Sequence, residues 1–397
     1  MSTVTTDGSY PSDAVVYSLE GKTLKLNTAE DVKQYVDEII ATKDLTEIRL
    51  SGNTFGVEAG RAIAHALKNR HSLRIASLSD MFTGRLRNEI PLVLEALAEA
   101  LEDKVNLVEL DLSDNAFGPA GAEPLQRLLI NNRNIQVLRL NNNGLGIEGA
   151  RLIAEALVTA AEKNKAEERK SALRVVVAGR NRMESKGIQH LCKAFEAHGE
   201  SLREIRMPQN SIRPEGIQVL MEALAACKNL EHLDLQDNTF TDVGSRSLAK
   251  VLPTWEKLRI LHVGDCLLSA SGSRAVLEAL TPGHLNLERL HLAFNEMDSE
   301  GAGYVAGMLL NKKNLVAIEL NGNAFDPEGD AVRDIKRVLL GHGHEEALDE
   351  LDEMEWEEEE EEEEAEEEEE EEKVPSEGEG DDEVSRLTAA LSEKLKV

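Results

Sequence analysis

A short apolar pattern, L-x-x-L-x-L-x-x-N-x-L, returns about every 28 residues along most of this chain. Its copies start at Leu45, Leu73, Leu107, Ile135, Leu173, Leu202, Leu230, Leu258, Leu287 and Leu315. Seven of the nine steps are 28 or 29 residues, and the two longer steps are 34 residues from Leu73 and 38 residues from Ile135. So regular a period predicts a solenoid, because a unit of this size cannot bury its apolar side alone and must stack on its neighbours.

Each copy contains a strand pattern followed by a helix pattern. The segment LEHLDL, residues 230–235, alternates between two faces as a half-buried strand does. The segment GARLIAEAL, residues 149–157, spaces its apolar residues three and four apart, which is typical of an amphipathic helix. The predicted fold class is therefore α/β. It is a leucine-rich repeat solenoid, a ribonuclease-inhibitor-like crescent with parallel strands on the concave face and helices on the convex face.

The asparagine of the pattern has a structural task. A turn between strand and helix leaves backbone donors and acceptors buried, and one amide side chain offers both a donor and an acceptor. These ladder positions are Asn53, Asn115, Asn143, Asn181, Asn210, Asn238, Asn295 and Asn323, with Cys266 in the eighth copy. Only Met81 departs from asparagine or cysteine at the ladder position. It lies in the second copy, which is also six residues too long.

The repeat frame predicts five segments. They are a disordered N-terminus over residues 1–16, an N-terminal cap over 17–44, about ten repeats over 45–340, an acidic disordered tail over 341–383 and a short C-terminal helix over 384–397. In the cap, Ser18–Asn27 is expected to form a half-repeat strand, and Thr28 and Asp31 have the spacing of a capping box. The step of 38 residues is attributed to an extended helix end and a polar loop over 161–172.

The acidic excess is concentrated at one end. The formal net charge is −31, and residues 345–397 contain 28 acidic and 4 basic residues. A glutamate run of this kind repels itself and has nothing apolar to bury, so disorder is expected. It is either a solubilising tail or an element that steers a basic partner during association. Nothing there is expected to hold paired carboxylates such as Asp349 and Asp352 in a cleft.

Several function classes lack their sequence signatures. No nucleotide-binding, zinc-protease or serine-hydrolase motif is present, and no metal site is predicted. The spacing of His342 and His344 could suit a metal, but surface positions are the favoured interpretation. Three isolated cysteines point to a reducing compartment without disulfides. The absence of a basic stripe argues against nucleic acid binding, and the absence of a long apolar run or secretory signal argues for an intracellular protein that does not span a membrane.

The residue before each ladder position is expected to face outward along the rim of the solenoid. In the fourth copy, Asn143 is the structural residue, and Asn141 and Asn142 are expected to be free to face a partner. Arg180 and Arg182 flank the ladder residue Asn181 in the fifth copy. The pre-ladder position in other copies is held by Asp80, Asp114, Asp237 and Asp265.

The stretched second copy contains the loop SDMFTGRLRNEIP, residues 79–91. It combines the missing ladder asparagine, six extra residues, a glycine at 84 and two arginines, Arg85 and Arg87. Long loops on a rigid scaffold often carry function, and a bland connection would serve as well with serine or lysine. This loop is therefore predicted to contact a partner.

These segments also carry a family resemblance. SDMFTGR, LSDNAFGP, LNNNGLG, GRNR and LQDNTFT, in this order and followed by a glutamate-rich tail, resemble the Ran GTPase-activating protein family of fungi. The resemblance implies a protein that stimulates hydrolysis of Ran-bound GTP in trans and supports nucleocytoplasmic transport. It implies Ran-GTP as partner, with a Ran-binding protein as a further candidate, and a monomeric, cytoplasmic chain excluded from the nucleus. No cofactor of its own is implied, since GTP and magnesium belong to the GTPase.

The resemblance also assigns roles to residues. Asn142 would fix the catalytic glutamine of Ran, and Arg85 would support the complex from outside the transition state, so that no arginine finger is used. The remaining candidate contacts to the partner are Arg87, Asp114, Asn141, Arg180, Arg182, Asp237 and Asp265.

Two alternatives remain at this point. The chain could be a non-catalytic leucine-rich repeat binding module or an acidic chaperone for basic proteins, and neither would accelerate GTP hydrolysis. It could also be an adaptor whose tail does the main work, in which case removing residues 345–397 would abolish activity. Hydrolysis of Ran-bound GTP with the intact and the shortened chain separates these hypotheses.

Overall fold

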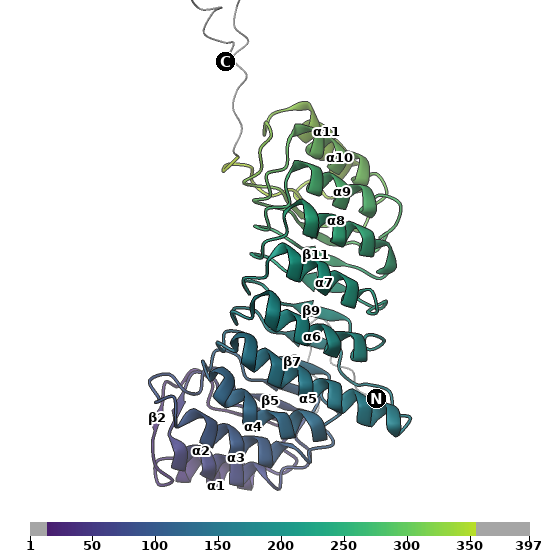
Figure 1. Ribbon diagram of the computed structural model, residues 1–397. Helices are drawn as coiled ribbons and strands as arrows, with labels where there is room; N and C mark the ends of the chain where they lie inside the picture. Colours follow the sequence, from purple (N-terminus) through teal and green to yellow (C-terminus); the bar gives the residue numbers. More distant parts are fainter. Residues whose placement is uncertain (1–13, 355–397) are drawn as a thin grey trace, which may run out of the picture. The chain divides into compact units, whose positions relative to one another are not determined.

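The computed structural model describes residues 14–354, and within them the chain forms a solenoid of parallel strands and helices (Figure 1). The main sheet pairs each strand with the next repeat's strand in sequence order. Its strands are β1 (Val16–Ser18), β3 (Glu47–Arg49), β5 (Ile75–Ser77), β6 (Glu109–Asp111), β7 (Val137–Arg139), β8 (Val175–Val177), β9 (Glu204–Arg206), β10 (His232–Asp234), β11 (Ile260–His262), β12 (Arg289–His291) and β13 (Ala317–Glu319). The predicted parallel arrangement is confirmed.

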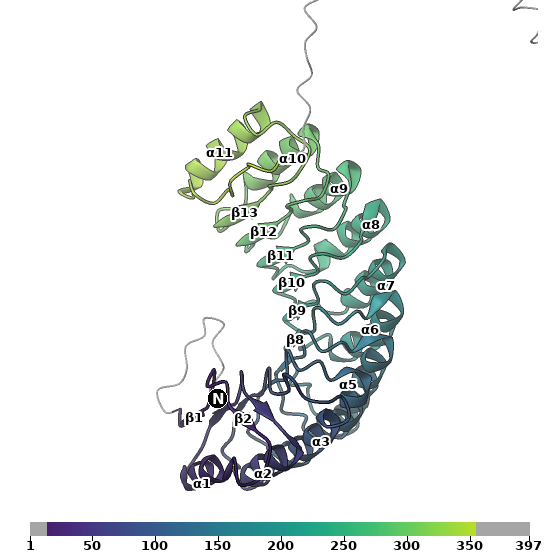
Figure 2. The ribbon, with the colours of Figure 1, turned by 90° about the vertical axis from the view of Figure 1, so that its left-hand side faces the viewer.

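The helices line the outer side of these repeats and the strands line the inner side (Figure 2). They are α1 (Lys33–Ala41), α2 (Val57–Leu67), α3 (Ile90–Leu101), α4 (Gly118–Asn131), α5 (Gly146–Ala166), α6 (Glu184–His198), α7 (Pro214–Leu224), α8 (Thr241–Val251), α9 (Ala270–Leu280), α10 (Ser299–Leu309) and α11 (Asp330–His342), with a 3₁₀ turn, η1 (Leu252–Thr254). Consecutive helices pack against each other, from α1 with α2 to α10 with α11. None of the helices within residues 14–354 is both long and apolar enough to cross a bilayer.

Alternation along each strand separates the core from the concave face. In β10, Leu233 is fully buried, and the ring of His232 lies on the opposite side and remains partly accessible. The corresponding residue of β9 is Ile205, which pairs with Leu233 and is equally buried. The middle residues of the strands thus form a continuous aliphatic core, and the first and third residues form the concave surface.

The asparagine ladder also forms as predicted. Asn143 accepts a hydrogen bond from the backbone N–H of Asn115 at 3.0 Å and donates to the carbonyl oxygen of Leu112 at 3.0 Å. Cys266 supplies the donor in the eighth repeat, through Sγ to the carbonyl oxygen of Leu235 at 3.4 Å. Met81 fills its ladder position with a fully buried apolar side chain. The ladder therefore links buried turns of neighbouring repeats, as the amide chemistry requires.

The N-terminal cap differs from the prediction in its strands. β1 begins at Val16, inside the segment 1–16 expected to be disordered, and it pairs with β3. The expected strand over Ser18–Asn27 is wrong, because the chain turns after Ser18 and only β2 (Lys25–Leu26) is extended, paired with β4 (Thr54–Phe55). Alternation alone could not place this turn.

The predicted capping box is confirmed by its two reciprocal hydrogen bonds. Thr28 Oγ1 accepts from the N–H of Asp31 at 3.2 Å, and Asp31 Oδ2 accepts from the N–H of Thr28 at 2.9 Å. The backbone N–H groups of Thr28 and Asn27 both donate to the Asp31 carboxylate, and these bonds lower its pKa. The regular helix α1 follows from Lys33.

The start of the predicted disordered tail, residue 341, is also wrong. α11 continues to His342 and ends at Gly343 in the left-handed conformation. The next residues fold back on β13, where Asp349 accepts hydrogen bonds from the N–H groups of Leu320 at 2.8 Å and Asn321 at 3.0 Å. These residues cap the sheet edge, which would otherwise present unpaired backbone groups. The rest of the predicted tail and the predicted helix over 384–397 lie outside the described residues.

Other polar side chains of this end are likewise structural. Asp352 Oδ1 accepts a hydrogen bond from Asn321 Nδ2 at 3.1 Å, so Asp349 and Asp352 are both held by the last repeat, contrary to expectation. His344 Nε2 bonds the carbonyl oxygen of Lys313 at 2.9 Å. Residues 343–354 therefore form a C-terminal cap.

Candidate functional site

The rim between strands and helices has one repeated backbone conformation. The pre-ladder residue adopts a positive φ, between 45° and 74°, in every repeat. These residues are Gly52, Asp80, Asp114, Asn142, Arg180, Gln209, Asp237, Asp265, Phe294 and Gly322. This left-handed region favours glycine, asparagine and aspartate. Turn geometry alone therefore explains the rim aspartates, and only their side-chain environments can distinguish functional from structural members.

Asn142 lies on this rim with its side chain exposed. Its backbone N–H donates to the carbonyl oxygen of Gly179 at 2.9 Å, which ties the turn to the next repeat. Its Nδ2 donates to Oδ1 of Asp114 at 2.9 Å, and its Oδ1 has no hydrogen-bond partner among residues 14–354. The Asp114 carboxylate thus orients the amide and leaves the amide oxygen available to an incoming donor.

Asn141 was predicted to be free to face a partner, and the structure contradicts this. Its Oδ1 accepts a hydrogen bond from the backbone N–H of Gly179 at 2.6 Å, and the side chain is partly buried. The same residue's carbonyl oxygen accepts from the N–H of Asp114 at 2.9 Å. Asn141 therefore contributes to the scaffold that holds Asn142, because both of its oxygens are used between repeats.

Arg85 reaches back from the stretched loop onto the N-terminal cap. Its Nη1 donates to Asn27 Oδ1 at 2.6 Å, and its Nε donates to Thr54 Oγ1 at 2.9 Å. Its Nη2 donates to the carbonyl oxygens of Thr54 at 2.9 Å and Leu26 at 3.1 Å. The guanidinium therefore spans β2 and β4, and all three of its nitrogens are engaged within the chain.

The rest of the stretched loop is anchored at its base and open at its tip. Met81 and Phe82 are buried, and Thr83 Oγ1 donates to Asp80 Oδ1 at 2.6 Å. Gly84 has a φ of 78°, which only glycine adopts without strain. Arg87 is exposed and forms no hydrogen bond or ion pair with residues 14–354. Arg87 is therefore the loop arginine that is available to a partner.

Arg180 and Arg182 are both exposed on the fifth repeat with positive φ. Arg180 Nε donates to Gln209 Oε1 at 2.5 Å, whereas Arg182 has no side-chain partner in the described part of the chain. Unlike glycine, asparagine or aspartate, arginine is not favoured in the left-handed backbone conformation, which costs it of order 1 kcal/mol or more. Their presence on the rim is thus not explained by the fold.

Backbone hydrogen bonds bring part of the predicted set together. In each case the backbone N–H of the pre-ladder residue donates to a carbonyl oxygen in the turn of the next repeat. Asp80 donates to Ser113, Asp114 donates to Asn141, and Asn142 donates to Gly179. At about 4.8 Å per strand, the span from the second to the fifth repeat is roughly 14 Å at the sheet. Asp237 and Asp265 lie in the seventh and eighth repeats, so they fall outside this group.

Some residues of interest were missed by the sequence analysis. Gln209 and Phe294 occupy pre-ladder positions without being glycine, asparagine or aspartate, and inspection of the residue before every ladder position would have found them. On the concave face, His262, His291 and Glu319 come within 4.8 Å of one another through their potential ligand atoms. Their wide separation in the sequence hid this group, because only strand pairing brings them together.

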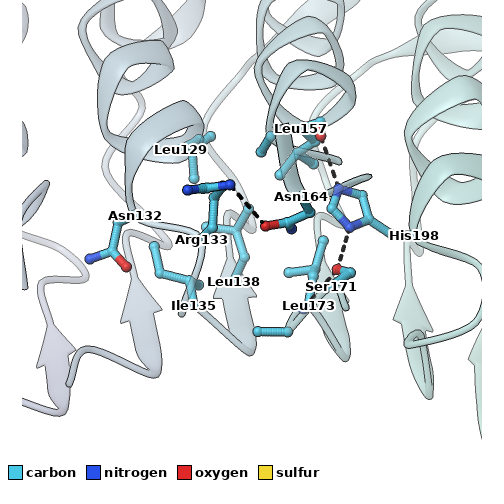
Figure 3. Close-up of a pocket in the computed structure, with 12 residues that line it drawn as sticks. Leu129, Asn132, Arg133, Ile135, Leu138, Leu157, Asn164, Ser171, Leu173 and His198 are labelled. Carbon is cyan, nitrogen blue, oxygen red and sulfur yellow. Dashed lines mark hydrogen bonds between the residues drawn. The ribbon is translucent and has the colours of Figure 1, made fainter. Parts of the chain in front are cut away.

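A small pocket beside the polar insertion is lined by residues of the third, fourth and fifth repeats (Figure 3). Its volume of about 20 Å³ suffices for one water molecule. His198 bonds the carbonyl oxygen of Leu157 through Nε2 at 2.9 Å and Ser171 Oγ through Nδ1 at 2.6 Å. Burial lowers the pKa of His198, so the ring is neutral at pH 7. The pocket is a packing feature that fastens the insertion to α6.

Comparison with known proteins agrees with the repeat architecture. A family model described as Leucine Rich repeat matches residues 104–125, 131–154, 226–249 and 283–306. Ran GTPase-activating protein 1 of Saccharomyces cerevisiae is 39% identical over 327 residues, which cover 80% of this chain and 80% of the relative.

Animal relatives match over a smaller part of their own length. The Ran GTPase-activating protein of Drosophila melanogaster is 37% identical over 316 residues, which cover 79% of this chain and 53% of the relative. Ran GTPase-activating protein 1 of Xenopus laevis is 48% identical over 198 residues, which cover 49% and 34%. The identity and coverage shared with the yeast relative, together with the leucine-rich solenoid, place this chain in the Ran GTPase-activating protein family.

Proposed function

We propose that this chain stimulates hydrolysis of GTP bound to Ran by positioning the catalytic glutamine of Ran in trans, without inserting an arginine finger. A Ras-like GTPase hydrolyses GTP slowly until its glutamine is held so that it orients the attacking water. Membership in a family whose relatives are named for Ran GTPase activation supports the activity. The proposed mechanism rests on the contrast between Asn142 and Arg85.

The environment of Asn142 carries the proposal. A residue that positions another side chain must itself be fixed in place. Asn142 is fixed by two hydrogen bonds, from its backbone N–H to the carbonyl oxygen of Gly179 and from its side-chain amide to Asp114. Its exposed Oδ1 is the atom that would accept a hydrogen bond from the amide of the partner's glutamine. Such an exposed acceptor on a fixed arm suits orientation of a neighbouring group, since no reorganisation is needed when the complex forms.

The contacts of Arg85 argue against a finger role for this residue. An arginine finger must reach the transferring phosphate, which would require the guanidinium to leave Thr54, Asn27 and Leu26. Water replaces some of these bonds at this partly exposed position, so giving up all of them would cost about 2 kcal/mol. This loss would offset part of the roughly 4–7 kcal/mol that a finger supplies. Arg85 is therefore assigned to bracing the cap and the loop that carries Arg87.

The partner set follows from the same surface. Arg87, Asp114, Arg180 and Arg182 line the rim on either side of Asn142, and they are the proposed contacts to Ran-GTP. Asp237 and Asp265 are exposed or partly exposed on later repeats and would contact either a more distant part of Ran or a Ran-binding protein. GTP and magnesium would be contributed by the GTPase. A monomeric chain that acts in the cytoplasm and is excluded from the nucleus completes the proposal.

The deciding experiment is single-turnover hydrolysis of Ran-bound GTP with three forms of the chain: intact, Asn142→Ala, and shortened by removal of residues 355–397. The shortened form keeps residues 343–354, since these cap β13. Acceleration by the intact and shortened chains, with a large loss in Asn142→Ala at unchanged Ran binding, supports the proposal. Binding without acceleration by the intact chain would instead identify a binding module, and activity that disappears with the tail would identify the adaptor.

A further inference from the structure

The concave face of the last three strands gathers two imidazoles and a carboxylate. His262, His291 and Glu319 are the final residues of β11, β12 and β13. Strand pairing places His262 beside His291 and His291 beside Glu319. Residues at one register of adjacent parallel strands share a face at about 4.8 Å spacing. All three side chains therefore lie on the inner side of the solenoid, where Figure 2 shows these strands.

The potential ligand atoms converge. One ligand atom from each residue lies within 4.8 Å of the others. The two imidazole rings have centroids 4.4 Å apart and are tilted by 30°. His291 Nδ1 is 2.8 Å from Glu319 Oε2, yet it is buried and forms no well-aligned hydrogen bond with any residue in 14–354. A buried ring nitrogen in this state lacks a satisfied partner, although buried polar atoms usually have one.

The two imidazole side chains are largely shielded from solvent. The side chains of His262 and His291 are only 22% and 13% exposed.

A carboxylate also lies behind the group. Asp234 Oδ1 is 3.7 Å from His262 Nδ1. Metal-bound histidines commonly place their second ring nitrogen toward a carboxylate, which orients the ring and raises its basicity. Asp234 is nearly buried and is also paired with Arg206, so its position is fixed. At 3.7 Å this pair is longer than a hydrogen bond, so Asp234 would orient His262 only after a small side-chain movement.

We propose that His262, His291 and Glu319 form a binding site for a divalent transition metal, with Zn²⁺ the ion best suited to it. Two imidazoles and one carboxylate are a ligand set that zinc accepts, with a fourth position left for water or a partner's donor. Calcium and magnesium prefer oxygen ligands alone. Donor atoms around a tetrahedral zinc lie roughly 3.4 Å apart, so small side-chain rotations close the remaining gap.

The site would tie three consecutive repeats together. β11, β12 and β13 belong to the eighth, ninth and tenth repeats, whereas Asn142 belongs to the fourth. Metal binding would therefore stabilise the C-terminal repeats by favouring the folded state in which the three ligands meet. This inference is independent of the proposed action on Ran, because it rests on other repeats and other chemistry.

The test is a titration of the metal-free full chain with Zn²⁺ by calorimetry, together with visible absorption after addition of Co²⁺. Four-coordinate Co²⁺ with nitrogen ligands absorbs strongly, whereas six-coordinate Co²⁺ on the oxygens of the glutamate run absorbs weakly. We expect one tight site, a strong Co²⁺ band and a higher melting temperature with Zn²⁺. His291→Ala and Glu319→Gln should weaken this site by more than about 100-fold, which exceeds the usual loss when a residue that only orients a ligand is changed.

His71→Ala is the matched control, because His71 is exposed and lies far from this sheet face in the sequence of repeats. It should bind Zn²⁺ as the unchanged chain does. Circular dichroism establishes that each variant folds, and the nearly isosteric Glu319→Gln decides the matter if His291→Ala is unfolded. The proposal is overturned if no tight site exists, if Glu319→Gln binds as tightly as the control, or if removing residues 355–397 removes the binding.

Discussion

Asn142 donates from Nδ2 to Oδ1 of Asp114, 2.9 Å away on the exposed rim, while the adjacent Asn143 is fully buried in the ladder. The two neighbouring asparagines thus perform different tasks. The side chain of Asn143 satisfies two buried backbone groups of the preceding repeat. The side chain of Asn142 satisfies no backbone group and presents its oxygen outward. This separation makes the candidate site experimentally distinguishable from the fold.

Alanine substitution at the two asparagines should have opposite consequences. Asn142→Ala should greatly slow single-turnover hydrolysis of Ran-bound GTP, with little change in melting temperature. Asn143→Ala should destabilise the chain by about 1–3 kcal/mol, because it leaves the N–H of Asn115 buried without its acceptor. Thermal denaturation and hydrolysis are measured for both variants. An equal loss of stability in the two would contradict the assignment.

Asp114→Ala should reduce the hydrolysis rate about fivefold, since the bond that it removes from Asn142 is worth about 1 kcal/mol. The lost bond to Asn142 should lower the rate at saturating chain, whereas loss of the proposed contact between Asp114 and Ran should lower the affinity separately. A double variant with Asn142→Ala provides the control. If Asp114 acts by holding Asn142, the double variant will be no slower than Asn142→Ala alone, and additive losses would show an independent role.

Arg85→Lys should be nearly as harmful as Arg85→Ala. A lysine ammonium cannot reproduce the planar fork that serves Thr54, Asn27 and Leu26 together. Both variants should lose about 2 kcal/mol of stability as well as activity, which chemical denaturation and GTP hydrolysis will measure. Arg87→Ala, on the exposed side of the same loop, should leave the stability unchanged. A fully active and stable Arg85→Lys chain would refute the bracing role.

Asp349→Ala should destabilise the last repeat. The change leaves the N–H groups of Leu320 and Asn321 without their acceptor and should cost about 1–3 kcal/mol. Removal of residues 355–397 is the comparison, and it should leave the melting temperature nearly unchanged because it spares this contact. Hydrogen exchange at the two amides offers a local measurement. Unchanged protection of both amides in Asp349→Ala would show that the cap does not depend on this carboxylate.

The stability of the chain should decrease as the pH falls from 7 to 5. Burial lowers the pKa of His198 below its ordinary value of 6.5, so the unfolded chain takes up the proton at a higher pH than the folded chain. Protonation therefore favours unfolding, and the stability contributed by neutral His198 is full above pH 6.5 and falls below it.

Titration of His198 alone changes the free energy of unfolding by at most about 1.4 kcal/mol per pH unit. His198→Gln should flatten the pH dependence measured by urea denaturation between pH 5 and 7, although it loses one hydrogen bond at every pH. The exposed His71→Gln serves as control and should keep the original slope. If both variants show the slope of the unchanged chain, His198 is not the titrating group.

The repeated pattern by itself determined the architecture of this protein. Its period predicted the parallel strands, the outer helices and the ladder, because burial of apolar side chains and of turn amides depends on local spacing that recurs in each copy. The same spacing separated Asn142 from Asn143. It also identified the stretched second repeat and its arginines, since departures from a regular repeat are visible without any structure.

Only the tertiary structure decided which of these side chains are available. Arg85 is engaged with Thr54 and Asn27, and Asn141 is engaged with Gly179, through hydrogen bonds between residues that lie 31 to 58 positions apart. The convergence of His262, His291 and Glu319 likewise depends on strand pairing. Such contacts depend on the register and curvature that stacking imposes on loops and side chains, whereas a sequence pattern specifies only the spacing within each repeat.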